Sequence, residues 1–301
     1  MSQSNEQRVS RLHGLWALTN RELKKWYKEP ILLFMSIIQP VIWMGLFGKA
    51  MNLNALFTST QFQMPPINPP LTPPQLQQLG EFFAGLQSGV MKSTFGTADY
   101  FSYMSVGMIS FVVLFTTMFS GMSIVWDRRL GFLNKVLSTP VSRGTIIFSK
   151  VLSATLRSIV QAAIIVVIAY AFGLQLSPTF NPVNILGLFA AIFLICLGLS
   201  SLFLMIALRS TRWETQMAVV NLLNLPLMFA SNTFFPTSMM PDWIQAIAKI
   251  NPITYTTDAI RQLLLYNMDV AQLMIDFTYL GIFAAIFTSI GIVLSWRYLS
   301  K

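Results

Sequence analysis

Long apolar stretches dominate the pattern of hydrophobic and polar positions along the chain. A hydrocarbon core about 30 Å thick needs about 20 apolar residues in a helix, because backbone polar groups must be satisfied within the segment. Six stretches meet this requirement, and they are Ile31 to Ala50, Tyr100 to Trp126, Ile146 to Phe172, Val183 to Leu208, Met217 to Phe235 and Leu273 to Trp296. The pattern therefore predicts an all-α integral membrane protein with six transmembrane helices.

Composition agrees with this class. Hydrophobic residues make up 54% of the chain and charged residues only 10%, whereas soluble proteins average about 25% charged residues. One cysteine, Cys196, and one histidine, His13, exclude an internal disulfide framework and a site built from several such ligands. We expect no metal site and no cofactor-binding site in this chain.

The basic residues predict the orientation. Fifteen of the 20 Lys and Arg residues lie in segments 1–30, 127–150, 209–216 and 297–301. Basic residues collect on the cytoplasmic side of membrane proteins, so both termini are expected in the cytoplasm and the chain in the plasma membrane. The net charge of +9 reflects this asymmetry and does not indicate binding to nucleic acid.

Residues 1–30 are expected to form a cytoplasmic N-terminus before a permease domain at 31–301. Within it, segment 10–29 has apolar residues at helical spacing and lysines around the rest of the turn. This pattern favours an amphipathic helix on the membrane surface, among anionic lipid headgroups, and Pro30 ends it. A generic basic anchor is the alternative.

Two regions are expected on the outer side, a loop and a helical pair that dips into the outer half of the membrane. Prolines favour an extended spacer in loop 51–99, followed by a short helix at Gln75 to Leu86. In 236–266, Pro241 begins one helix that runs to Lys249, and Thr256 or Thr257 caps a second that runs to Tyr266. Since neither helix can span, a re-entrant helical hairpin is predicted.

The cytoplasmic turn at 127–145 carries a short amphipathic helix. Its apolar residues recur at helical spacing from Leu130, Thr139 precedes Pro140 and leaves the helix, and Ser142 caps the third span. A helix of two turns cannot bury an apolar strip by itself. The strip is therefore expected either to enter a groove of another protein or to lie on the membrane surface.

Two motifs resemble one known family. "DRRLGFLNKVLSTPVSRGTIIFSK" is similar to the cytoplasmic signature of the ATP-binding-cassette (ABC) type 2 permeases, especially their drug-resistance exporter branch, and "FFPTSMMPDWIQAIAKINPITYTTDAIRQLL" resembles their outer hairpin. The resemblance implies a homodimer, two copies of a separate ATPase subunit, and a coupling helix that docks into that subunit. The residues so implied are Asp127, Arg128, Arg129, Leu130, Gly131, Phe132, Leu133, Lys135, Val136, Leu137, Pro140, Val141, Ser142 and Arg143.

A phosphate-binding loop needs a glycine-rich turn that leads to Gly-Lys-Ser/Thr. The only Gly-Lys pair, Gly48 and Lys49, is followed by Ala50 in an apolar span. ATP and Mg²⁺ are therefore expected in the partner ATPase, and no catalytic residue is assigned here.

Polar residues inside the spans are candidates for the translocation pathway. Arg157 and Gln161 share one helical face of the third span, and Gln216, Asn221 and Asn224 lie in the fifth. Polar groups at depth usually face a bundle interior or a pathway. Two alternatives remain, because Arg157 can also extend to the inner headgroups and the amides can form hydrogen bonds between helices.

The expected function is export of a hydrophobic drug-like molecule, lipid or glycolipid, with cargo and direction implied by the resemblance alone. A proton-coupled secondary transporter is one alternative, but no predicted span has an acidic residue near its centre. A membrane-embedded enzyme is the other, and the sequence shows no carboxylate pair, histidine cluster or activated nucleophile.

Overall fold

The computed structural model describes residues 11–50, 72–139, 141–209 and 212–299. Within these ranges every regular element is a helix. The elements are α1 (Arg11–Lys28), α2 (Pro30–Trp43), the π-helical η1 (Met44–Ala50), α4 (Pro73–Phe95), α5 (Tyr100–Arg129), α6 (Phe132–Leu137), α7 (Arg143–Ala171), α8 (Val183–Arg209), α9 (Trp213–Phe229), the 3₁₀ turn η2 (Thr237–Met239), α10 (Asp242–Ala248), α11 (Pro252–Leu264) and α12 (Val270–Leu299). The predicted all-α class is confirmed.

Five helical segments of the described chain are long and apolar enough to cross a membrane. They are Leu33–Ala50, Pro73–Arg129, Gly144–Ala171, Val183–Arg209 and Val270–Leu294. Each contains or overlaps one of the predicted spans, so a multi-pass membrane protein is supported.

The predicted fifth span is wrong at its outer end. Its helix, α9, has 17 residues and ends at Phe229, so residues 230–235 lie outside it. In this segment the guanidinium of Arg261 donates hydrogen bonds to the carbonyl oxygens of Asn232 and Thr233, at 2.7 and 3.0 Å, so these oxygens are satisfied outside a helix. The count of six spans stays a prediction.

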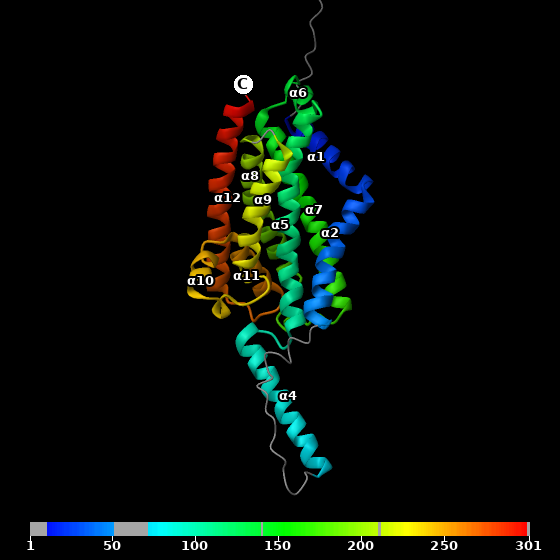
Figure 1. The fold of residues 1–301 in the computed structure, drawn as a ribbon, viewed down its shortest axis with the longest axis vertical. Coiled ribbons are helices and arrows are strands. Elements are labelled where there is room, and N and C mark those ends of the chain that lie inside the picture. The colour runs from blue at the N-terminus through cyan, green and yellow to red at the C-terminus, as the bar shows by residue number, and fades with distance from the viewer. Residues whose placement is uncertain (1–10, 51–71, 140, 210–211, 300–301) are drawn as a thin grey trace, which may run out of the picture.

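Helix α5 forms the centre of the bundle and is buried along nearly its whole length. It packs against α7, α8 and α11, while α12 packs against α8. Figure 1 shows α1 and α2 along one side of the bundle, with α6 and the C-terminal end of α12 together at one end. Helices α4, α10 and α11 lie at the opposite end. Segments that the sequence assigns to opposite sides of the membrane thus lie at opposite ends of the fold.

Helix α1 covers the segment predicted to be the N-terminal amphipathic helix, and its place on the membrane surface stays a prediction. Trp16 and Lys24 are exposed on it, whereas Thr19 and Glu22 are buried against the bundle. Pro30 stands in the first turn of α2, where its missing N–H leaves no hydrogen bond unmade.

The helix in the long outer loop is longer than predicted. It runs over Pro73–Phe95 and not over 75–86. Two prolines occupy its first turn, which tolerates them, and the Thr72 backbone N–H donates to the Gln75 side chain at 2.9 Å. The preceding proline-rich residues 51–71 lie outside the described residues.

The two short helices predicted after the fifth span are confirmed as α10 and α11, but the predicted cap of α11 is wrong. Asn251, and neither Thr256 nor Thr257, caps the helix, because its side-chain oxygen accepts from the Ile253 N–H at 3.0 Å. The two threonine hydroxyls instead donate to carbonyl oxygens one turn earlier in α11. The helix therefore begins at Pro252, four residues before the earlier threonine.

Candidate functional site

The connection from α5 to α7, residues 130–142, is a compact turn that contains α6; we call it the α5–α7 turn. Gly131 precedes α6 with φ of 71°, a left-handed conformation that glycine adopts without the steric cost of a Cβ atom. Helix α6 then ends at Leu137. The Ser142 hydroxyl accepts from the Thr145 N–H at 3.2 Å and starts α7, which confirms the predicted cap. Pro140 lies outside the described residues.

Part of the predicted apolar strip is covered by the chain itself. Leu133 and Val136 are 4% and 7% exposed. They belong to a buried cluster with Ile146 and Val151 of α7 and Leu204 of α8. The chain itself therefore covers Leu133 and Val136, whereas Leu130 of the same strip is exposed; docking of the turn into another protein stays a prediction.

The outward face of the turn is mixed polar and apolar. Leu130 is 74% exposed and is the large apolar side chain that the turn leaves uncovered. Exposed beside it are Arg129, Gly131, Asn134, Lys135, Ser138 and Thr139. A partner approaching this end of the bundle meets these side chains, and not those of Leu133 and Val136.

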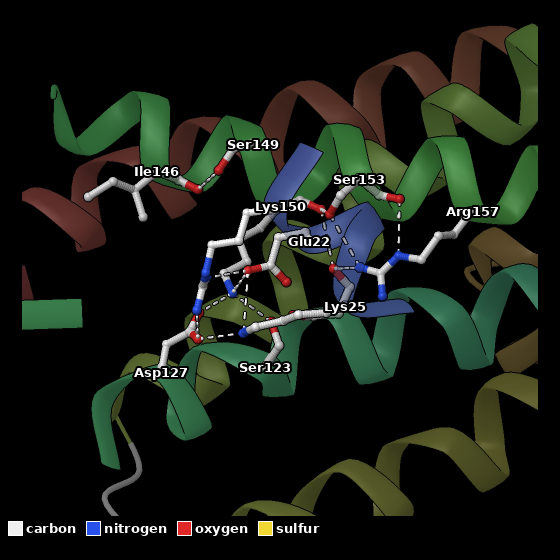
Figure 2. A network of polar contacts seen from close by, with 11 residues as sticks. Glu22, Lys25, Ser123, Asp127, Ile146, Ser149, Lys150, Ser153 and Arg157 are labelled. Carbon is white, nitrogen blue, oxygen red and sulfur yellow. Dashed lines mark hydrogen bonds and ion pairs between the residues drawn. The ribbon is translucent and has the colours of Figure 1, made fainter. Parts of the chain in front are cut away.

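Behind the turn lies a cluster of five charged residues, Arg21, Glu22, Lys25, Asp127 and Lys150, which we call the inner ion cluster. Lys150 Nζ lies 3.0 Å from Glu22 Oε1 and also pairs with Asp127. Lys25 Nζ and Arg21 Nη2 approach Asp127 Oδ1 at 3.0 and 3.3 Å. Figure 2 shows Lys150 between the two carboxylates, with the Ser123 hydroxyl within the same group.

The inner ion cluster fixes three helices behind the α5–α7 turn. Its members come from α1, α5 and α7, and the side chains of Glu22, Asp127 and Lys150 are only 4 to 6% exposed. Charges removed from water cost several kcal/mol each unless they are paired. The guanidinium of Arg21 also lies 3.2 Å from the centre of the Phe132 ring in α6. The α5–α7 turn therefore contacts α1 through Phe132, in addition to its covalent connections to α5 and α7.

Sequence reasoning missed this cluster. Asp127 was predicted to contact a partner, but it is buried and serves inside the chain. Two signals were available: Lys150 interrupts an otherwise apolar span, and Glu22 is an acid within a basic helix. What the sequence does not give is the pairing across more than 100 positions between Glu22 and Lys150.

The other residues predicted for the turn have varied surroundings. The Arg128 guanidinium donates to the Leu208 carbonyl oxygen at 3.4 Å and so connects the end of α5 with the end of α8. Phe132, Leu137 and Val141 are half-buried and pack on the cluster around Leu133. Arg143 begins α7.

The structure brings Arg157 and Gln161 together at the wall of one cavity. Gln161 bonds to two other helices, accepting from the Thr116 hydroxyl at 2.5 Å and donating to the Ser36 hydroxyl at 2.6 Å. Arg157 donates to the carbonyl and hydroxyl oxygens of Ser153, one turn nearer the start of α7. Both residues line a cavity of about 380 Å³ between α1, α2, α5, α7 and α9.

The three amides of α9 lie apart from this cavity. Gln216 is fully buried, and neither its oxygen nor its nitrogen has a hydrogen-bond partner among the described residues. Asn224 is buried and its oxygen is likewise unpartnered, whereas Asn221 is exposed. The five predicted pathway residues therefore do not form one site within a single chain. In the described part of the chain, no group of three or more His, Cys, Asp or Glu residues is placed to hold a metal ion.

Together, the bundle of long apolar helices and the buttressed turn at one end define a multi-pass membrane protein. The chain belongs to the ABC-2 type transporter family, which matches residues 13–265. It is thus a membrane transport subunit of an ABC transporter, and permeases of this family work with ABC ATPase subunits.

Individual relatives are also similar over much of the chain. The ycf38 transport permease of Cyanophora paradoxa is 28% identical over 251 residues, covering 83% of this chain and 73% of that protein. The ycf38 protein of Porphyra purpurea is 29% identical over 81% of this chain and 72% of that protein. The daunorubicin resistance ABC transporter permease protein DrrB1 of Streptomyces coeruleorubidus is 23% identical over 56% of this chain and 59% of that protein.

Proposed function

We propose that this chain is the membrane-spanning subunit of an ATP-driven exporter and that two copies assemble with two ATPase subunits. ATP and Mg²⁺ bind to the ATPase. The cargo is a hydrophobic drug-like molecule, lipid or glycolipid, moved outward across the plasma membrane, and both termini are cytoplasmic. The name of the DrrB1 relative and the basic charge of the inner segments support this proposal.

The observation that carries the proposal is the buttressing of the α5–α7 turn. A coupling element must transmit movement of the ATPase to the spans, so it must be rigid against its own chain and exposed toward the partner. Buried Leu133 and the inner ion cluster supply the rigidity, and exposed Leu130 and Lys135 supply the contact. We therefore assign the ATPase contact to the outward face of the turn.

The test is the substitution Leu130→Asp. The side chain is 74% exposed, so the change leaves the fold intact. In a closed contact with the ATPase it buries an unpaired carboxylate, which costs several kcal/mol. Since 1.4 kcal/mol is tenfold in an equilibrium constant, retention of the ATPase is expected to weaken about a hundredfold or more.

The matched control is Leu76→Asp on α4, an exposed leucine at the opposite end of the bundle. Both variants are purified by a tag on the permease, and the co-purified ATPase and its hydrolysis rate are measured. Leu76→Asp is expected to keep the partner. If Leu130→Asp keeps it equally well, the turn does not carry the contact. Specific ATP hydrolysis by the purified permease alone contradicts the assignment of ATP to a partner.

A further inference from the structure

The cavity beside Arg157 is predominantly apolar and aromatic. Its volume of about 380 Å³ lies in the range of small-molecule sites. Trp26, Trp126 and Trp213 line it from three helices, and the rings of the last two lie 4.9 Å apart. Phe119 and Trp126 are 54% and 43% exposed, so their rings are available to a ligand. Such a lining suits the hydrocarbon or aromatic body of an amphiphile.

Arg157 is the cationic residue in the lining of this cavity. Arg157 lies seven residues after Lys150 in α7, which is about 10 Å further along the helix at 1.5 Å per residue. Its Nε and Nη2 donate to the Ser153 carbonyl and hydroxyl oxygens at 3.1 and 3.2 Å, and Nη2 also reaches the Ser120 hydroxyl at 3.4 Å. Figure 2 shows the guanidinium held against Ser153 and apart from the inner ion cluster.

No carboxylate of the described chain lies within ion-pair distance of the Arg157 guanidinium. Arg157 takes part in none of the ion pairs found among the described residues. The residues lining the cavity include no Asp or Glu. Glu22 of the inner ion cluster attracts the Arg157 charge across space, but this carboxylate already pairs with Lys150 and Arg21. An ionised group at membrane depth is costly without a counter-charge, and such residues ordinarily pair.

The unused donors of the guanidinium define the ligand. Nη2 donates to Ser153 and Ser120, whereas Nη1, which carries two N–H groups, makes no hydrogen bond within the described chain. Charged N–H donors of this kind match the oxygens of a carboxylate, phosphate or sulfate. Gln161 and Thr116 bond to each other nearby and add polar lining without charge.

We propose that this cavity binds an amphiphile with an acidic headgroup, whose anionic oxygens pair with Arg157 and whose apolar body lies among Phe119 and the tryptophans. Such a molecule is either the cargo or an anionic lipid of the inner leaflet, and the chemistry is the same in both cases. Its identification as cargo rests on the proposed transport function, whereas binding itself requires only the permease.

The binding experiment uses the full permease without ATPase, in nanodiscs of phosphatidylcholine. The probe is phosphatidic acid with a diazirine in one acyl chain, and the comparison probe is phosphatidylcholine with the same chain. After illumination, labelled peptides of α5 that contain Phe119 or Trp126 are quantified by mass spectrometry. Because charge-assisted hydrogen bonds to Arg157 favour the acidic headgroup, the acidic probe is expected to label about tenfold more.

Variants separate charge from structure. Arg157→Gln is expected to abolish the preference for the acidic probe, while Arg157→Lys, which keeps the charge but loses the planar fork, retains part of it. The matched control is Arg209→Gln, an exposed arginine at the end of α8 that lines a different hollow. Equal labelling by both probes, or an unchanged preference in Arg157→Gln, overturns the proposal.

A second arm distinguishes the two sources of the ligand. When the permease is reconstituted with its ATPase, ATP is expected to reduce labelling if the acidic amphiphile is cargo. Labelling that keeps its acidic preference and is insensitive to ATP identifies a resident lipid. Both results support the acidic site. Failure of the transport function appears only in this arm, whereas failure of the site appears already with the permease alone.

Discussion

Removing the amine of Lys150 tests whether the inner ion cluster holds α1 against the bundle. Lys150→Met keeps most of the side-chain volume but leaves Glu22 and Asp127, whose side chains are 5% and 4% exposed, without their shared buried cation. Breaking a buried pair in this way costs about 3–5 kcal/mol. Arg21 and Lys25 remain near the carboxylates but are 29% and 44% exposed, so we take the lower end of that range.

A cost of about 3 kcal/mol changes the docking equilibrium of α1 about a hundredfold. A disulfide reports docking directly. A Cβ atom built on Gly14 of α1 lies 3.5 Å from Val141 Cγ2 in the α5–α7 turn, a separation that allows the pair Gly14→Cys and Val141→Cys to cross-link. The assay is the initial rate of cross-linking in membranes under mild oxidant, in a background with the single cysteine removed by Cys196→Ala.

The rate is expected to fall severalfold or more in Lys150→Met. Two controls are expected to cross-link like the parent. Lys150→Arg keeps the positive charge, and Lys28→Met removes an exposed lysine at the end of α1. Adding Asp127→Asn to Lys150→Met removes one stranded charge and is expected to restore part of the rate. An undiminished rate in Lys150→Met means that apolar packing alone docks α1, and refutes the reasoning from charge.

Three further predictions follow from the fold. In cells, a cysteine introduced at Glu81 is expected to react with an impermeant reagent, whereas one at Lys24 reacts only after permeabilisation; labelling of position 24 in intact cells contradicts the orientation. Gly107→Ala places a methyl group against the backbone carbonyl oxygen of Thr233, so the variant is expected to lose about 1–3 kcal/mol and to unfold at a lower temperature in detergent. Gly85→Ala, which meets no atom within 4 Å, serves as its control. Asn251→Ala is expected to lose about 1–3 kcal/mol of stability in the same assay, because the Asn251 amide donates to backbone carbonyl oxygens at the end of α9 at 2.6 and 2.9 Å. Asn251→Asp keeps the cap but not the amide donor and is expected to recover part of this stability. Equal losses in the two variants refute the role of the amide.

The helices could be predicted because their signals are local. Apolar runs, prolines at first turns and Ser142 before α7 each act within a few residues, and α1, α7 and α8 begin and end close to the predicted positions. The errors occur where a contact with a residue distant in sequence determines the end of a helix. Residues 230–235 were read as part of a span, but Arg261 takes up the carbonyl oxygens of two of them.

The candidate site divides in the same way. Periodicity identified the apolar face of α6 correctly, yet it does not say what covers that face, and a two-turn helix is too short to exclude burial against its own chain. Here α7 and α8 cover Leu133 and Val136. Likewise, Arg157 and Gln161 were recognised as one helical face, but the cavity exists only because Trp26 and Trp213 come from helices far away in sequence.

A continuous set of contacts connects the turn with the cavity. Lys150 pairs with Asp127 at the inner end of α5, and its carbonyl oxygen accepts from the Ser120 hydroxyl at 3.2 Å. The oxygen of the same hydroxyl accepts from Arg157 Nη2 at 3.4 Å. Lys150 and Arg157 both belong to one uninterrupted helix, α7, which begins directly after the α5–α7 turn. A packed helix moves as a unit because interiors are close-packed and deform little, so a displacement imposed on the turn also moves the guanidinium that faces the cavity. In the proposed site, an acidic ligand paired with Arg157 therefore lies where movement of the α5–α7 turn changes its binding.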